Sequence, residues 1–192
     1  MKKVLIIVAI IFVILIVIAI GIAGRVKNIY NTMVTIDEEV NGAWAQVENV
    51  LQRRYDLIPN LVETVKGYAS HEKEVLTQVT EARARVGGAG SPAERMGAEG
   101  EMSNALSRLL VVVENYPQLK ANQNFIMLQD QLEGTENRIA VERGRYNDVV
   151  KRYNQYIRQF PQMFFAGMFN FKLREFFEAP EAAQQAPKVS FQ

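Results

Sequence analysis

The pattern of apolar residues changes after Gly24, and this change divides the chain. Residues 4–24, VLIIVAIIFVILIVIAIGIAG, contain no charged or strongly polar side chain. As a helix rising about 1.5 Å per residue, the run would be roughly 30 Å long, which is the thickness of a bilayer's hydrocarbon core. The pattern therefore predicts a transmembrane anchor over residues 1–24. A cleaved signal peptide is the alternative, but its apolar region usually has about 7–15 residues.

Beyond the anchor, apolar residues recur at alternating steps of four and three. The first series comprises Ile29, Met33, Ile36, Val40, Ala43, Val47 and Val50. Such heptad spacing predicts the buried face of a long helix. Because no Pro or Gly lies between Arg25 and this series, we expect the membrane helix to continue directly into an extramembrane helix that reaches about residue 51.

Three further apolar series predict three more helices, at 58–86, 102–113 and 125–160. GGAGSP at 87–92 breaks the chain between the first two, and Pro117 prevents easy continuation before the last. No strand pattern competes with these series. The predicted fold is therefore all-α, with an N-terminal single transmembrane helix that continues into an antiparallel up-down four-helix bundle of long, coiled-coil-like helices over residues 25–160.

Pro59 lies inside a helix-like run and leaves two interpretations open. A proline here loses the hydrogen bond to the carbonyl of Tyr55 and clashes with it. The chain either turns between Arg53 and Asn60 or kinks and continues as a helix. We favour the turn, because a helix from Arg25 to Val86 would exceed about 90 Å and would be mostly without packing partners.

The same stretch places charges on apolar helix faces. Arg54 falls on the heptad series, where a charge persists only if it is partnered. The candidate structural charge cluster comprises Arg53, Arg54, Asp56, Glu72 and Glu142. We hypothesise that the two arginines pair with one of these carboxylates, in bidentate geometry, and fix the helix register at one end of the bundle. A clamp for an anionic ligand is the alternative.

Composition limits the chemistry that the chain can perform. The 22 Lys and Arg residues against 21 Asp and Glu residues leave a net charge of +1, which disfavours nucleic-acid binding. There is no cysteine, and His71 is the single histidine, so zinc-protease and di-iron patterns are missing. No strand–turn–helix elbow frames a serine nucleophile. We therefore assign no catalytic, cofactor-binding or metal-binding residue, expect no cofactor and predict that the protein is not an enzyme.

The C-terminal region is rich in phenylalanine. Seven of the ten phenylalanines lie from Phe160 to Phe177, and six of these fall in a predicted amphipathic segment at 161–179, which precedes a flexible tail at 180–192. We expect these side chains to fold back over the bundle, and a membrane surface or a subunit interface is the alternative. The candidate membrane or oligomer contacts are Phe164, Phe165, Phe169, Phe171, Phe176 and Phe177.

Several segments resemble the LemA family of bacterial membrane proteins. They are YNTMV, VNGAWAQV, QRRYDLIPNLVETVKGYASHE, EARARVG, YPQLKANQNF and RYNDVVKRYNQYIRQFP. The resemblance covers nearly the whole chain and is most specific at 53–61 and 116–122. It implies an N-terminally anchored four-helix bundle without an established enzymatic activity. A member in magnetosome-forming bacteria belongs to the machinery that shapes an internal membrane, so the resemblance also suggests scaffolding.

These observations predict a membrane-anchored, non-enzymatic helical scaffold that self-assembles in the bacterial envelope and organises or shapes membrane. Its expected partners are the lipid bilayer, further copies of the chain and a membrane protein. The alternative is an adaptor or regulator of another membrane protein, such as an envelope protease. We expect a single pass through the bacterial cytoplasmic (inner) membrane. The amino terminus, Lys2 and Lys3 place three positive charges before the anchor, and Arg25 and Lys27 place two after it. This difference narrowly favours a cytoplasmic N-terminus, with the soluble part outside the cytoplasm.

Overall fold

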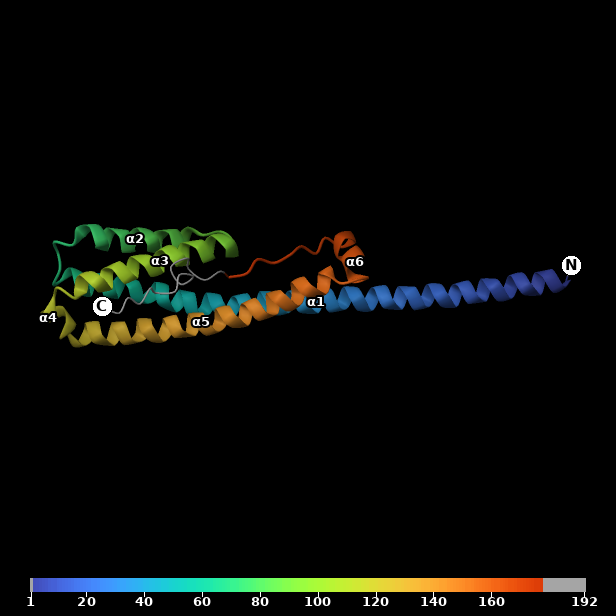
Figure 1. Ribbon diagram of the computed structural model, residues 1–192, viewed down its shortest axis with the longest axis horizontal. Coiled ribbons are helices and arrows are strands. Elements are labelled where there is room, and N and C mark those ends of the chain that lie inside the picture. The colour runs from blue at the N-terminus through green and yellow to red at the C-terminus, as the bar shows by residue number, and fades with distance from the viewer. Residues whose placement is uncertain (1, 178–192) are drawn as a thin grey trace, which may run out of the picture. The chain divides into compact units, whose positions relative to one another are not determined.

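The computed structural model describes residues 2–177, without the side chains of residues 2–4, 8 and 9 (Figure 1). These residues contain helices α1 (Lys2–Lys66), α2 (Lys73–Gly88), α3 (Pro92–Val113), α4 (Pro117–Lys120), α5 (Gln123–Arg158) and α6 (Gln162–Met168). No strand occurs within this range, so the predicted all-α class is confirmed. The predicted flexible tail at 180–192 lies outside the described residues, as do residues 178 and 179.

The chain divides into two compact units. Of the described residues, the first unit comprises 2–42 and 148–174, and the second comprises 43–147 and 175–177. Helices α1 and α5 each contribute to both units. These borders divide the chain differently from the predicted bundle at 25–160 and the predicted segment at 161–179.

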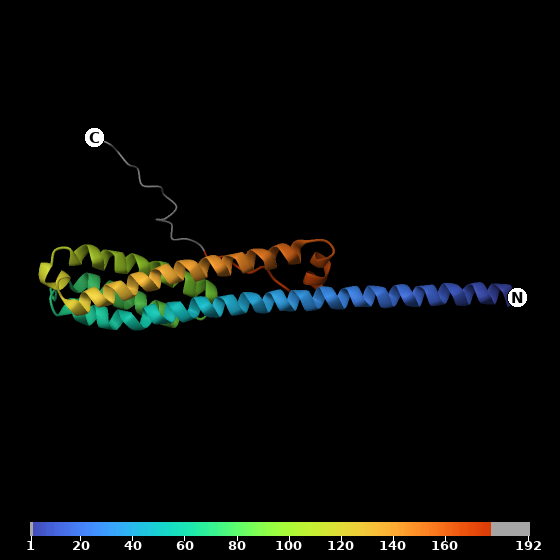
Figure 2. The ribbon, with the colours of Figure 1, turned by 90° about the horizontal axis from the view of Figure 1, so that it is seen from below.

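The second unit is an antiparallel bundle of four helical segments. The C-terminal part of α1, helices α2 and α3, and the first part of α5 run alternately up and down (Figures 1 and 2). The core draws on all four segments and on α4, through Ile58, Leu61, Val65, Ala69, Leu76, Val79, Ala82, Val86, Met102, Ala105, Leu109, Val113, Leu119 and Phe125. Most of these residues belong to the predicted apolar series, because burial of one face is what stabilises an amphipathic helix.

The predicted break at 87–92 is present and has a local cause. Pro92 occupies the first turn of α3, and the Ser91 hydroxyl accepts a hydrogen bond from the Glu94 N–H at 3.2 Å. The Glu94 carboxylate reaches back to the Gly90 N–H at 2.8 Å. These two bonds satisfy backbone donors that a helix start leaves free, and they begin α3 at this position.

The predicted turn between Arg53 and Asn60 is wrong, because α1 runs through Pro59 and ends at Lys66. Proline removes the donor that would normally bind the Tyr55 carbonyl. The Arg83 side chain of α2 donates to this carbonyl from Nε at 3.2 Å, and its guanidinium lies 3.9 Å from the centre of the Tyr55 ring. A neighbouring helix therefore supplies the missing donor, and the chain turns later, between Lys66 and Lys73.

The first unit joins the apolar run of α1 to a packed region. Between Leu5 and Ile22, every large apolar side chain that the structure describes is exposed. Farther along α1, Met33 and Val40 are buried, together with Val150, Tyr153 and Ile157 of α5 and Ala166 of α6. One helix, α1, is long and apolar enough to cross a membrane. An apolar surface of this extent is favourable in lipid and unfavourable in water.

Candidate functional site

Two charged side chains are buried in the described part of the chain, Arg54 and Glu99. Arg54 Nη2 pairs with the Glu99 carboxylate. Arg54 Nη1 lies 2.5 Å from Glu136 Oε2 and 3.1 Å from Ser103 Oγ. One guanidinium is thus shared between two carboxylates, and the predicted bidentate pair is not formed.

Three helices of the second unit supply this cluster. Arg54 comes from α1, Glu99 and Ser103 lie one turn apart on α3, and Glu136 comes from α5. Arg95, one turn before Glu99, places its Nε 4.0 Å from the other Glu99 oxygen. The cluster ties three segments of the bundle together at one level, because each ion pair of Arg54 joins a different pair of helices. Buried ion pairs of this kind can specify register.

The hypothesis about the partners of Arg54 requires correction. Among the described residues, Asp56, Glu72 and Glu142 are not ion-pair partners of Arg54. Arg53 and Asp56 are exposed, and Asp56 accepts a hydrogen bond from Gln52 at 2.8 Å. The other two carboxylates have partners of their own: Glu72 accepts from the Tyr116 hydroxyl at 2.8 Å, and Glu142 pairs with Arg145 at 2.7 Å.

Their positions explain why Asp56 and Glu72 do not pair with Arg54. Asp56 is two residues away on the same helix, and residues at that spacing do not face each other. Glu72 lies beyond Lys66, the last residue of α1, which is already about 18 Å along the helix axis from Arg54. The Tyr116 pKa is raised by the hydrogen bond to Glu72, by burial and by the Glu72 charge.

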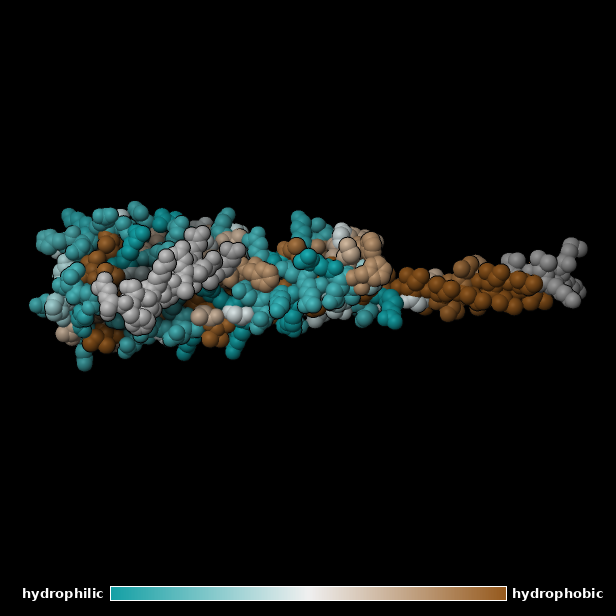
Figure 3. Space-filling view, viewed as in Figure 1, coloured by the Kyte–Doolittle hydropathy of each residue, from teal (hydrophilic) through white to brown (hydrophobic). Residues whose placement is uncertain are grey.

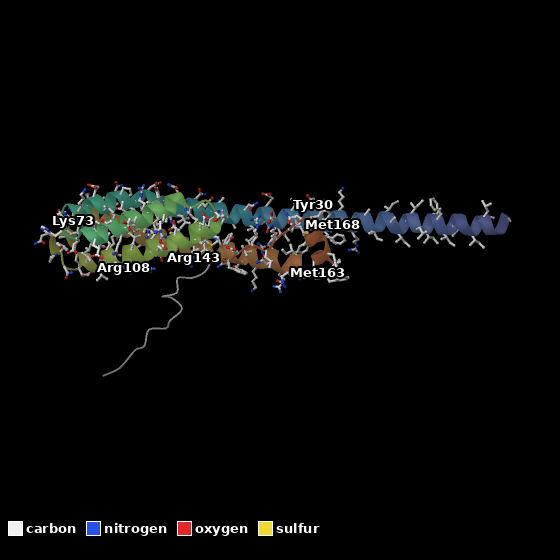
Figure 4. All side chains as sticks on the ribbon, turned by 90° about the horizontal axis from the view of Figure 1, so that it is seen from above. Tyr30, Lys73, Arg108, Arg143, Met163 and Met168 are labelled. Carbon is white, nitrogen blue, oxygen red and sulfur yellow. The ribbon has the colours of Figure 1, made fainter. Side chains whose placement is uncertain are left out.

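Arg54, Glu99, Ser103 and Glu136 line a cleft of about 650 Å³ in the second unit. Arg143, labelled in Figure 4, also lines it and stacks its guanidinium 4.3 Å from the centre of the Phe177 ring. Burial lowers the pKa of Arg143, and the Glu136 charge opposes this effect. Because the lining carries both signs of charge, it does not favour a ligand of one sign. The alternative anion clamp is disfavoured, since two carboxylates occupy Arg54 while Arg53 is exposed.

A second set of polar residues holds the segment that follows α6. In the first unit, the Tyr153 hydroxyl donates to the Lys172 carbonyl at 2.8 Å. The Asn154 side chain donates to the Arg174 carbonyl at 2.8 Å and accepts from the Arg174 N–H at 2.9 Å. The Arg174 side chain pairs with Asp37 of α1 at 2.9 Å. This segment is therefore fixed to both α5 and α1.

The second unit repeats this arrangement seven residues earlier on α5. The Tyr146 hydroxyl donates to the Glu175 carbonyl at 3.0 Å. Asn147 donates to the Phe177 carbonyl at 2.9 Å and accepts from the Phe177 N–H at 2.8 Å. The Trp44 ring packs edge-on against Tyr146 at 5.5 Å. Phe177 is buried here.

Sequence reasoning missed these tyrosines and asparagines, although a signal was present. The dipeptide Tyr-Asn occurs twice at heptad spacing in RYNDVVKRYNQYIR. An asparagine amide both donates and accepts, so it can bind both backbone groups of one residue in an extended segment. Two such amides on one helix face indicate a binding surface for an extended chain.

The candidate phenylalanines lie in different environments. Phe177 is buried, and Phe165 and Phe171 are half-buried. Phe164, Phe169 and Phe176 are exposed. Folding back therefore describes some of this region but leaves an apolar surface uncovered.

No catalytic constellation emerges in the part of the chain that the structure describes. Within it, no group of three His, Cys, Asp or Glu side chains is placed to hold a metal ion. His71 is exposed in the connection between α1 and α2.

Comparison with known proteins identifies the family. The model of the LemA family matches residues 43–191, which is most of the chain. The chain belongs to the LemA family. This LemA-family protein is 29% identical to magnetosome protein MamQ 2 of Paramagnetospirillum magneticum, over 80% of this chain and 66% of the relative. It is 26% identical to magnetosome protein MamQ of Magnetospirillum gryphiswaldense, with the same coverage. The chain thus spans just under two thirds of the length of these relatives.

The family membership and the apolar part of α1 together indicate a membrane-associated protein. Neither the family description nor the names of the MamQ relatives is that of an enzyme.

Proposed function

We propose that this LemA-family protein is a membrane-anchored, non-enzymatic helical scaffold that self-assembles and organises or shapes membrane. Its proposed location is the bacterial cytoplasmic membrane, with a single pass and the soluble part outside the cytoplasm. The observation that carries the proposal lies in the first unit, where the exposed apolar run of α1 continues in the same helix into residues that pack against α5 and α6. The MamQ relatives are magnetosome proteins, and similarity to them supports a role at a membrane.

Self-assembly has a physical basis in the anchor. Confinement to a membrane plane raises the effective concentration of one copy around another, so weak lateral contacts become sufficient. Several apolar residues of α1 beyond the anchor lie outside the heptad series, among them Tyr30, Val34, Trp44 and Leu51. Leu51 is buried, Trp44 packs against Tyr146, and the partly exposed Tyr30 packs against Phe169. Val34 is exposed on the same helix and is the candidate contact between copies.

The mass of the full chain in mild detergent tests this proposal. The chain has a mass of 21.8 kDa, and self-assembly requires a protein mass of at least twice this value. Val34→Lys should shift the population toward the monomer. Thr35→Lys, at the adjacent exposed polar position, is the matched control and should not. A wild-type chain that is strictly monomeric would contradict self-assembly.

An adaptor or regulator of another membrane protein is the second candidate, and a groove in the second unit favours it. This groove of about 230 Å³ lies between α3 and α5 and is lined by Leu61, Leu106, Leu110 and Leu132, with Gln129 and Glu133 beside them. Such a surface suits an amphipathic helix of a partner. Leu110→Glu should then abolish capture of one defined membrane protein, whereas Val111→Glu at the neighbouring exposed position should preserve it.

A further inference from the structure

Helix α6 and its flanks expose an apolar surface in the first unit. This α6 patch consists of Phe160, Met163, Phe164, Met168, Phe169 and Leu173, whose exposed fractions lie between 38% and 78%. The Phe160 and Phe164 rings pack edge-on at 5.8 Å, so the surface is continuous there. A contiguous apolar patch on a protein marks an interaction site.

Contacts with α1 place the patch beside the end of the apolar run. The Phe169 ring lies 4.9 Å from the Tyr30 ring, and the Phe171 ring lies 6.0 Å from it. Tyr30 is six residues beyond Gly24, which corresponds to about 9 Å along the helix axis. Figure 4 shows Met168 next to Tyr30, and Figure 3 shows the apolar surface at α6 next to the bare apolar helix.

This position corresponds to the depth of lipid headgroups. The headgroup region adds roughly 5–8 Å to each side of the hydrocarbon core. If the apolar run to Gly24 fills the core, side chains that pack around Tyr30 lie within or immediately above the headgroups. Tyr30 suits this depth because a tyrosine combines an apolar ring with a polar hydroxyl, and phenylalanines are typical of the apolar face of segments that lie in the interface.

The charges around the patch fit an anionic lipid surface. Arg25 and Lys27 follow the apolar run, Arg158 ends α5 and Lys172 follows α6, and all four side chains are exposed. The sequence has no Asp or Glu between Gly24 and Asp37, or between Val149 and Arg174. Basic residues beside exposed aromatic residues are typical of segments that lie in the membrane interface.

We propose that the α6 patch docks into the headgroup region of the same bilayer that α1 spans, with a preference for anionic lipid. The inference deepens the proposed function and depends on it in one respect, that α1 is a membrane anchor. Docking gives each copy a second membrane contact beside its anchor. This contact restricts rotation of α1 about its own axis and thereby orients the packed region of the first unit.

Tryptophan fluorescence in the full-length chain tests the proposal. Trp44 is the single tryptophan, so Trp44→Phe provides a silent background. Phe164→Trp and Met168→Trp report on the patch, Phe12→Trp reports on the anchor, and Val111→Trp is an exposed control on α3. The proteins are reconstituted in vesicles of phosphatidylcholine, with or without phosphatidylglycerol, whose acyl chains carry bromine near the top, to quench the patch reporters, or near the end, to quench the anchor reporter, or carry no bromine. Both patch reporters should be blue-shifted relative to the control and lose emission to bromine, whereas the control should not.

Each result decides the proposal. Quenching at Phe12→Trp without quenching at either patch reporter would overturn α6 docking and leave the anchor standing. An absence of quenching at all three would overturn the anchor and the docking together. A blue shift that depends on protein concentration, without bromine quenching, would assign the patch to a second copy and would also overturn lipid docking. Quenching that is stronger with phosphatidylglycerol than with phosphatidylcholine alone supports the stated lipid preference.

Discussion

Replacement of Arg54 by methionine should destabilise the second unit strongly without changing its helix content. Methionine has a high helix propensity and fills a similar volume, so α1 should persist. The substitution removes the main counter-charge of Glu99, which remains buried with Arg95 Nε at 4.0 Å as its nearest ion-pair partner. The perturbation therefore leaves a buried carboxylate poorly compensated.

The structure also sets the relative size of the effect at each partner. Loss of one member of a buried ion pair costs about 3–5 kcal/mol, so Arg54→Met should lower the midpoint of thermal unfolding by roughly 6–20 °C. The side chain of Glu136 is 53% exposed, and Glu136→Gln should cost less than about 1 kcal/mol. Removal of both buried charges, in Arg54→Met with Glu99→Leu, should restore most of the stability because neither charge remains unpaired.

Thermal and urea unfolding of the full chain in detergent, followed by circular dichroism, measures these differences. Arg54→Met, Glu99→Leu and the variant that carries both form a double-mutant cycle, whose coupling free energy should be several kcal/mol. Costs at Arg54 and Glu99 that simply add would refute the interpretation that the two residues form one buried pair. A loss of less than about 1 kcal/mol in Arg54→Met would refute it as well.

Three other contacts give further predictions. Arg83→Met should lower the free energy of unfolding by about 1–3 kcal/mol in the wild-type background. The loss should be much smaller in a Pro59→Ala background, because the introduced alanine supplies its own N–H to the Tyr55 carbonyl. Urea unfolding of the four proteins measures both losses, and equal losses would contradict the prediction. Asn154→Ala should speed proteolysis after Lys172, because it removes both hydrogen bonds to Arg174, whereas Gln155→Ala at the next, exposed position should not. The Tyr153 pKa is raised by burial and by Asp37, so the folded state holds this proton more tightly than the unfolded state. Stability should therefore fall as the pH rises above about 10, and Tyr153→Phe should flatten that fall; an unchanged alkaline slope would contradict it.

Apolar spacing was sufficient to predict the fold class, the continuation of the apolar run into the rest of α1, and α3 and α5 in outline, whereas the predicted helix at 58–86 is interrupted between Lys66 and Lys73. The predicted helices at 102–113 and 125–160 correspond to α3 and α5, and the break at 87–92 is present because Ser91, Pro92 and Glu94 form a local cap at the start of α3. Heptad position also identified Arg54 as a charge on a buried face. These features depend on residues that are close in sequence.

The errors arose where a distant residue decides the outcome. Helix α1 continues through Pro59, and Arg83 of α2 binds the Tyr55 carbonyl that the proline leaves without a donor. No local sequence pattern predicts that contact. The partner Glu99 was missed although it lies three residues before Met102, at the helical position that precedes the first residue of the predicted 102–113 series. Glu136 borders the buried Thr135 and could not be distinguished from other helical carboxylates without the packing of α5 against α1.

The central claim, a membrane-anchored scaffold that assembles with itself, is tested most directly by photo-cross-linking in intact membranes. A cross-linking amino acid replaces Val34, which is exposed on α1 beyond the anchor. The account predicts a membrane-bound product with twice the 21.8 kDa mass of the chain, in which both components are this protein. A product that contains one copy joined only to a different protein, or a chain recovered without the membrane, would contradict it.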